Sequence, residues 1–389
     1  MKKIFKNYAA LAFGALVAVS MTACHHGGSE ADVAGEGYKT LPTTLKVAKT
    51  LQVKVNGTLP AGVVPTYNGV PGTLSNGYYV WENVTDNGTL SLTGTGLVPQ
   101  VINGLSFGSR STVAIEMEAV AKKTGTTVTS ATDANVTDQV DQSEVAAKLP
   151  AAAADATVSG QEFLVQIFPQ AMAPVEVAKG EEVESTPYAL YCLPNHSADF
   201  AAPVEVNLNL EGCDGTEEVA LENGKDNLPL KWNATTRQFD GTIPHFSIWN
   251  IILKTTIVDI TESSETIGTF ALKQGTNNIS YNEKFGFTTT STGILARTLR
   301  ALFGATETTI NKSFEMKSDY VGTLTLTQIK KIVSLKSGNR TFEAIVWGEV
   351  KQQVTYEAAA IPEEATPAAP EVVVPTPTHN GGSSSQPGV

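Results

Sequence analysis

The sequence predicts a mainly β protein of tandem antiparallel β-sandwich domains of the immunoglobulin-like kind, the last carrying a short amphipathic helix. Many short segments alternate between apolar and polar residues, as strands with one buried face do, and turn-forming residues separate them about every ten positions. Charged residues make up only 17% of the chain, and long Leu-, Glu- and Lys-rich stretches typical of helical proteins are absent.

Shifts in composition along the 389 residues predict the domain organisation. In order, we expect a signal peptide (1–23), a flexible tether (24–40), a first sandwich domain (41–132), a linker (133–156), a second sandwich domain (157–253), a β-rich third domain (254–357) and a tail (358–389). The tail is rich in Pro, Ala, Gly and Ser, so it cannot bury a core and is expected to be disordered.

The first residues show the pattern of a secretory signal peptide. A basic start precedes an apolar run over residues 8–19, and small residues follow before Cys24. That run is too short to span the ~30 Å hydrocarbon core of a bilayer, which favours a cleaved signal over a retained transmembrane helix.

The motif Met21, Thr22, Ala23 and Cys24 resembles the lipobox of bacterial lipoproteins, with Met21 at the position where Leu is usual. The resemblance implies that Cys24 becomes the mature N-terminus and carries acyl chains, palmitate among them, that hold the protein at a membrane. No Asp follows Cys24, which by the habit of that class indicates the outer membrane. The alternative is an ordinary cleaved signal with an incidental cysteine.

In the first domain, residues 112–120 form the clearest strand, with Val113, Ile115 and Met117 on one face. The linker is rich in Ala, Asp, Gln and Val, and we expect a solvated acidic connection there, with a short helix ending at Pro150.

The second domain contains alternating strands over residues 163–168, 188–192 and 204–210. Its closing stretch Ile243–Trp249 resembles the last strand of sandwich modules in bacterial surface proteins, which implies a fold and no activity. Within that stretch His245 and Ser247 project to the same face. Because no carboxylate partner is identifiable, a structural histidine is favoured over a catalytic pair.

Cys192 and Cys213 form an even pair in a chain expected to be exported. An oxidising compartment permits a disulfide between them, which would add about 3 kcal/mol of stability in the chain-entropy model. Two buried free thiols are the alternative.

The third domain alternates Thr- and Ser-rich strands with one helix over residues 293–303, which Gly304 ends. Its apolar side chains lie at helical spacing, with Arg297 and Arg300 on the opposite side. The apolar set is Ile294, Leu295, Leu299, Leu302 and Phe303. These residues are expected either to pack on a sheet or to contact a membrane.

The formal net charge of −12 argues against nucleic-acid binding, because an acidic surface repels phosphate backbones. The sequence shows no metal-ligand cluster, cofactor motif or paired-carboxylate motif, so we expect no metal, no cofactor and no enzymatic activity. Tyr78, Tyr79, Trp81 and Trp232 could stack on sugars, although core packing is the ordinary role of such residues.

Cys24 and the stretch Ile243–Trp249, together with the tether and the alternating strands, resemble uncharacterised Bacteroides-type cell-envelope lipoproteins. Some relatives in that family are labelled as candidate pore-forming toxins. The resemblance implies a lipid-anchored outer-membrane or cell-surface protein with a structural or binding role toward an envelope protein or glycan, facing either the periplasm or the exterior. A membrane-inserting, pore-forming-toxin-like protein is the alternative, and a glycan-processing enzyme is the third hypothesis.

Overall fold

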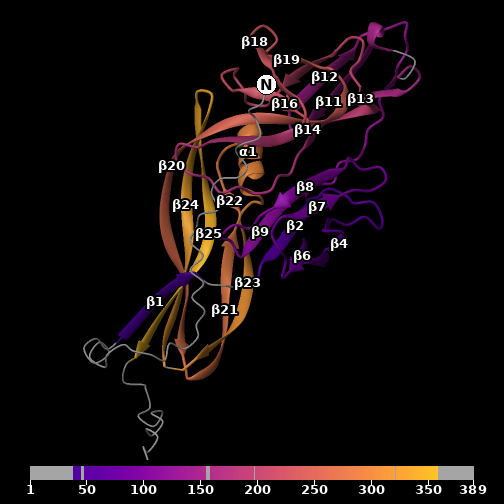
Figure 1. Ribbon diagram of the computed structural model, residues 1–389. Coiled ribbons are helices and arrows are strands. Elements are labelled where there is room, and N and C mark those ends of the chain that lie inside the picture. Colours follow the sequence, from indigo (N-terminus) through magenta and orange to yellow (C-terminus); the bar gives the residue numbers. More distant parts are fainter. Residues whose placement is uncertain (1–37, 45–47, 155–157, 197, 320, 358–389) are drawn as a thin grey trace, which may run out of the picture. The chain divides into compact units, whose positions relative to one another are not determined.

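The computed structural model describes residues 38–44, 48–154, 158–196, 198–319 and 321–357. This part of the chain is mainly β and contains several sheets (Figure 1). The signal peptide, Cys24 and the tail lie outside the described residues. Residues 40–356 form one compact unit, to which the following paragraphs refer. None of the helices in the described ranges has the length and apolarity that crossing a bilayer requires.

The first sandwich comprises two four-stranded sheets, in the orders β5-β6-β2-β9 and β4-β3-β7-β8. Its strands are β2 (Thr50–Asn56), β3 (Thr66–Tyr67), β4 (Val70–Pro71), β5 (Thr73–Ser75), β6 (Tyr78–Glu82), β7 (Gly88–Leu92), β8 (Gln100–Leu105) and β9 (Thr112–Glu118); β1 (Tyr38–Thr44) precedes them. Leu51, Leu90 and Ile115 of these strands are buried in a common core. One pair departs from the antiparallel expectation, because β2 and β9 run parallel, from Thr50 opposite Thr112 to Asn56 opposite Glu118.

The second sandwich places a five-stranded sheet, in the order β11-β12-β15-β19-β18, over part of the largest sheet. The five strands are β11 (Ala134–Val140), β12 (Ser143–Leu149), β15 (Val204–Asn209), β18 (Lys231–Asn233) and β19 (Gln238–Ile243). The opposing strands are β10 (Thr126–Thr127), β13 (Glu162–Pro169), β14 (Glu182–His196), β16 (Val219–Glu222), β17 (Asn227–Pro229) and the first half of β20 (Phe246–Leu272). Val206 and Trp249, from opposite sheets, are buried in the same core.

The expected linker over residues 133–156 is wrong, because these residues supply strands β11 and β12 of the second sandwich and a 3-10 helix (Ala151–Ala153). The strands are lined with small or polar buried residues, such as Ala147 and Asp138, so the apolar alternation is weak in the sequence. Asp141 and Gln142 form the connecting turn with φ of 46° and 62°. A two-residue hairpin turn of this kind normally contains Asn-Gly or Asp-Gly, which is why the sequence does not reveal it.

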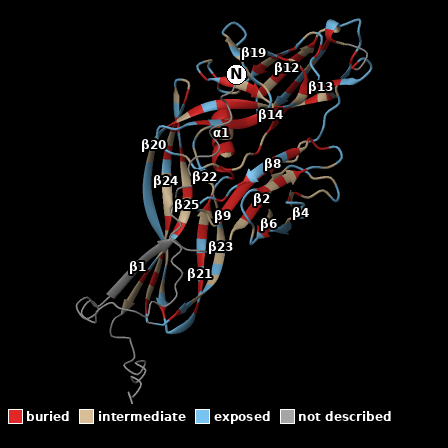
Figure 2. Ribbon diagram, viewed as in Figure 1, coloured by how far each residue is buried: buried red, intermediate tan, exposed pale blue. Residues whose placement is uncertain are grey.

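β20 is a single strand of 27 residues that belongs to both the second sandwich and the long-stranded part of the fold. Its first half pairs with β14 and its second half with β24 (Gly322–Ser337), which in turn pairs with β25 (Arg340–Glu357). The expected domain boundary at residues 253/254 therefore falls inside a strand. Figure 2 shows much of β20 in pale blue, where both faces are exposed over Thr261–Thr266.

A two-stranded ribbon folds back over these long strands. It consists of β21 (Gly275–Phe285) and β23 (Thr308–Ser318), with β22 (Phe287–Thr288) and α1 (Gly293–Phe303) in the connection between them. Ile279 and Tyr281 of β21 share a core with Leu326 of β24 and Val350 of β25. At the far end of β21, the backbone N–H of Lys284 donates to Oε1 of Gln328 at 3.0 Å. The ribbon therefore lies along the sheet from which it emerges.

Candidate functional site

Cys24, the expected lipidation residue, lies outside the described residues. Cys192 and Cys213 are both free thiols and both are buried, so the structure shows the alternative to the expected disulfide. Cys192 lies on β14, and Cys213 follows β15 in an irregular segment. Burial raises the pKa of each thiol, which keeps the sulfur protonated and unreactive.

The helix α1 occupies residues 293–303, the range that the apolar spacing indicates, and Figure 2 shows it mostly in red. All five of the apolar residues singled out in the sequence are buried, namely Ile294, Leu295, Leu299, Leu302 and Phe303. They contribute to the core of the second sandwich. Their packing on the sheets accounts for the helical spacing, so contact with a membrane is not needed to explain it.

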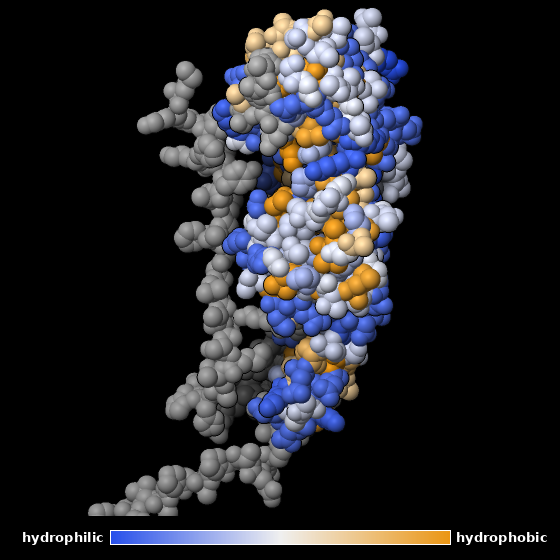
Figure 3. All heavy atoms as spheres, turned by 90° about the vertical axis from the view of Figure 1, so that its right-hand side faces the viewer, coloured by the Kyte–Doolittle hydropathy of each residue, from blue (hydrophilic) through white to orange (hydrophobic). Residues whose placement is uncertain are grey.

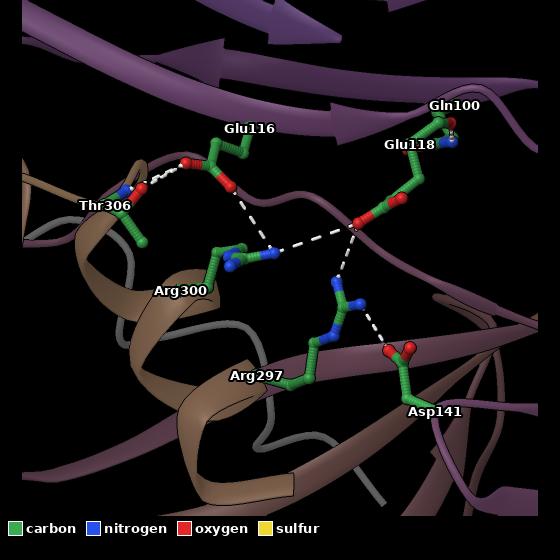
Figure 4. A network of polar contacts seen from close by, with 7 residues as sticks. All are labelled: Gln100, Glu116, Glu118, Asp141, Arg297, Arg300 and Thr306. Carbon is green, nitrogen blue, oxygen red and sulfur yellow. Dashed lines mark hydrogen bonds and ion pairs between the residues drawn. The ribbon is translucent and has the colours of Figure 1, made fainter. Parts of the chain in front are cut away.

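The polar side of α1 is held by carboxylates from two other parts of the fold (Figure 4). Nη1 of Arg297 lies 3.0 Å from Oε1 of Glu118 on β9, and its Nη2 pairs with Asp141 in the β11–β12 turn. Nη1 of Arg300 lies 3.4 Å from Oε2 of Glu116, also on β9. The two arginines thus tie the helix to the first sandwich and to the edge of the second.

Glu116 is almost fully buried and accepts two hydrogen bonds from Thr306, from the backbone N–H at 3.1 Å and from Oγ1 at 2.6 Å. Burial acts to raise the pKa of Glu116, but the bonds from Thr306 and the charge of Arg300 outweigh it and bring that pKa below its usual value. The two arginines of α1 and the carboxylates of Glu116, Glu118 and Asp141 pair with one another. These pairs hold α1 in place in the fold.

His245 is buried immediately before β20 and has a carboxylate partner that the sequence did not reveal. Its Nε2 lies 3.1 Å from Oδ2 of Asp226 and 3.2 Å from Nδ2 of Asn223. Ser247 accepts a hydrogen bond from the same Asn223 amide at 3.4 Å, and its Oγ donates to a backbone oxygen at 3.4 Å. Neither of these two bonds joins Oγ of Ser247 to the imidazole of His245, a contact that a nucleophile and its base would require.

Three of the four singled-out aromatic residues belong to the first sandwich; Trp81 and Tyr79 pack in its core, and Tyr78 contacts the ribbon. Trp81 is buried and its Nε1 donates to the carbonyl of Val70 at 2.8 Å, while Tyr78 OH lies 2.9 Å from Oγ1 of Thr308. Tyr79 is half-buried against the same core. These contacts make Tyr78 and Trp81 structural.

Trp232, the fourth aromatic residue, lines a groove of about 350 Å³ at the edge of the second sandwich. The groove forms where the chain crosses from β17, in the largest sheet, to β18, in the five-stranded sheet. Leu230, at the crossing, donates its backbone N–H to the carbonyl of Val219 at 2.9 Å and lines the groove as well.

The indole of Trp232 is fixed from two sides. Its ring centroid lies 5.0 Å from that of Phe239 in an edge-on arrangement. The backbone of Gly215 approaches the indole so closely that a Cβ at this position would lie 2.3 Å from the ring. Gly215 also has a φ of 88°, a conformation that other residues rarely adopt.

Carboxylates and one ammonium group complete the wall of the groove. The side chain of Glu217 is fully buried; its Oε2 accepts the backbone N–H groups of Asp214 and Gly215 at 3.1 Å each. Its Oε1 lies 3.9 Å from Nε of Arg340 and has no hydrogen-bond partner in the described residues. Nζ of Lys254 lies 3.2 Å from Oε2 of Glu218.

A second hollow of about 300 Å³ adjoins the groove, because both are lined by Glu218 and Lys254. Sequence reasoning singled out Trp232 but missed the charged residues. Glu184, Glu217 and Lys254 come from three separate segments, and only the pairing of β14, β16 and β20 brings them together. No local signal in the sequence marks them.

No protein-family model matches the chain, and no curated protein matches it. Among solved structures, the chain is similar to one from Bacteroides vulgatus that bears the name "Putative pore-forming toxin", with a TM-score of 0.20 and 11% identity over 45% of this chain and 80% of that chain. At a TM-score this low, the two chains share too little geometry for a conclusion about function. The resemblance to Bacteroides-type lipoproteins therefore stays a prediction.

Proposed function

We propose that this protein is a lipid-anchored, non-enzymatic binding protein of the bacterial outer membrane, which presents the groove at Trp232 to a partner in the cell envelope. The tandem immunoglobulin-like arrangement of its sandwiches and the anchor at Cys24 are part of this proposal. The observation that carries it is the groove itself, which has a fixed aromatic wall, a buried carboxylate and a volume in the range of ligand sites.

The anchor is tested by metabolic labelling with palmitate. The wild type is expected to take up the label, and Cys24→Ala is not. Protease treatment of intact cells then distinguishes the two orientations, since cleavage of the folded part requires exposure on the exterior. Equal labelling of both variants would remove the anchor from the proposal.

The binding role is tested by chemical crosslinking of whole envelopes followed by affinity purification of the chain. We expect the same partner in repeated experiments and its loss in Trp232→Ala. Tyr79→Ala, which removes a half-buried aromatic side chain from the first sandwich, is the matched control. Recovery of no partner from native envelopes would contradict this function.

Membrane insertion is the second candidate, and the register of the fold-back ribbon favours it. The β20–β24 ladder ends with Leu272 opposite Gly322, and the β21–β23 ladder begins with Gly275 opposite Ser318. The two ladders therefore continue the same hairpin in nearly the same register, with a sharp bend between them.

The ribbon strands have 11 residues each, and burial alternates along β21. Strands that span a bilayer need about 9–11 alternating residues, so a ribbon that swung out could present its apolar side to lipid. Its inner side also holds the ion pair between Glu283 and Lys312, at 3.3 Å, which would add to the cost of insertion. Figure 3 shows one face of the resting protein, where hydrophobic residues form separate small patches.

Dye release from liposomes tests this second candidate. The chain with Cys24→Ala is added at micromolar concentration to vesicles that contain a quenched dye. If the ribbon inserts, Gln328→Leu should accelerate release, because it removes the side chain that bridges Lys284 to the sheet. No release by either variant would exclude insertion and leave the binding role intact.

A further inference from the structure

We infer that the groove at Trp232 binds a neutral oligosaccharide. This inference rests on the proposed binding function and specifies its ligand. Two features of the described residues lead to it: a fixed aromatic wall and the balance of charges around the groove.

The aromatic wall suits the apolar face of a sugar ring. Trp232 is only partly buried although Phe239 and Gly215 hold its indole in place. The contacts of the described residues leave its Nε1–H without an acceptor. A fixed, partly exposed indole with a free donor offers both a surface for C–H groups and a hydrogen bond for a hydroxyl.

The charges around the groove disfavour anionic ligands. Four carboxylates line the groove and the adjoining hollow, and two lysines lie among them; these residues are Glu182, Glu184, Glu217, Glu218, Lys254 and Lys336. A polyanion would be repelled, because the carboxylates outnumber the lysines and Lys254 is already paired with Glu218. A polyhydroxylated neutral ligand can instead donate to the carboxylates and accept from the ammonium groups, which makes charge-assisted hydrogen bonds of both kinds.

The side chain of Glu217 is fully buried beneath the wall of the groove. Two backbone N–H groups hold its Oε2, and Oε1 has only the longer contact of 3.9 Å to Arg340. Glu217 therefore fixes the backbone of Gly215 and, because Gly215 abuts the indole, helps to set the position of Trp232 in the groove.

The groove and the hollow share Glu218 and Lys254, so a ligand can extend from one into the other. A groove of about 350 Å³ lies at the lower end of the range for small-ligand sites, and the adjoining hollow lengthens it. This continuity favours a short oligosaccharide over a single sugar.

The test is titration calorimetry of the purified full-length protein in detergent. The probes are neutral oligosaccharides of glucose, mannose, galactose, xylose and N-acetylglucosamine, with polygalacturonate as the anionic probe. We expect at least one neutral probe to bind and polygalacturonate not to bind. Trp232→Ala and Glu184→Gln should each weaken binding by about tenfold or more, since each removes one wall contact.

Glu315→Gln is the matched control, because it neutralises an exposed carboxylate on β23, outside the groove, and should leave binding unchanged. Glu184 is exposed, so its substitution keeps the test valid if Trp232→Ala does not fold. The inference is overturned if no neutral probe binds, if polygalacturonate binds more tightly, or if Glu184→Gln binds like the wild type. Capture of an envelope protein without saccharide binding would overturn this inference alone and retain the proposed function.

Discussion

Arg297 and Glu118 form an ion pair of 3.0 Å that joins α1, inside the fold-back ribbon, to the last strand of the first sandwich. The same guanidinium pairs with Asp141 in the second sandwich, so one side chain connects three parts of the fold. Burial would lower the pKa of Arg297, but Glu118 and Asp141 raise it above the ordinary value. The charge is therefore maintained in the folded state.

Removal of this side chain should destabilise the whole unit. In Arg297→Ala we expect the free energy of unfolding to fall by about 2 kcal/mol, below the 3–5 kcal/mol typical of a fully buried pair, because both carboxylates remain partly exposed. Urea denaturation followed by circular dichroism measures the change. Lys179→Ala removes an exposed pair with Asp259 and should cost less than about 1 kcal/mol. Equal losses in both variants would contradict the connecting role of Arg297.

Stability should depend on pH through Glu116. The folded-state pKa of this carboxyl lies below its unfolded value, so its contribution is present above the unfolded pKa of about 4.3 and is lost as the pH falls through the folded pKa. Glu116→Gln is therefore expected to be less stable than the wild type at pH 7, with the difference narrowing below pH ~4. Denaturation curves across this pH range test it, and a constant difference would show that the charge of Glu116 is unimportant.

The helix should behave as part of the core. Leu299 is fully buried, and Leu299→Ala is expected to lower the free energy of unfolding by about 2–5 kcal/mol, the range for truncation of buried leucines. Ile332→Val, at a position on β24 that is 38% exposed, should change it by less than about 1 kcal/mol. A neutral Leu299→Ala would indicate that α1 is not packed as described.

The state of the two cysteines can be read directly. In the Cys24→Ala chain, we expect no reaction of native protein with a thiol reagent such as dithionitrobenzoate, because both thiols are buried and their pKa values are raised. After unfolding in guanidinium without reductant, both thiols should react. If neither reacts after unfolding, a disulfide joins Cys192 and Cys213, contrary to the structure.

Many strand positions could be predicted from local alternation, but strand lengths could not. The alternating stretches 257–261 and 268–272 are separated by polar residues in the sequence, yet both belong to β20. Residues 262–266 between them are exposed on both faces, so no apolar alternation marks this part of the strand although the backbone pairing continues. The hairpin at Gly338 and Asn339 was predictable, because its turn residues are characteristic.

The groove shows the other limit of sequence reasoning. Trp232 can be singled out in the sequence because it is aromatic. Glu184 and Lys254, which line the same groove, are exposed charged residues on separate strands, and nothing in the sequence distinguishes them from other such residues. Their proximity depends on strand pairing over long distances in sequence, which no local pattern encodes. The same holds for Asp226, the partner of His245.

The length of β20 has a consequence for how this protein can vary through evolution. Because one continuous strand serves the second sandwich at one end and the long hairpins at the other, a break near residue 254 would separate the two ladders where they meet and divide the core that Leu253, Ile257 and Leu335 share. The segments on either side cannot be exchanged or duplicated as independent building blocks. A recombination event that preserves folding must transfer β20 together with the second sandwich and the long hairpins with which it pairs.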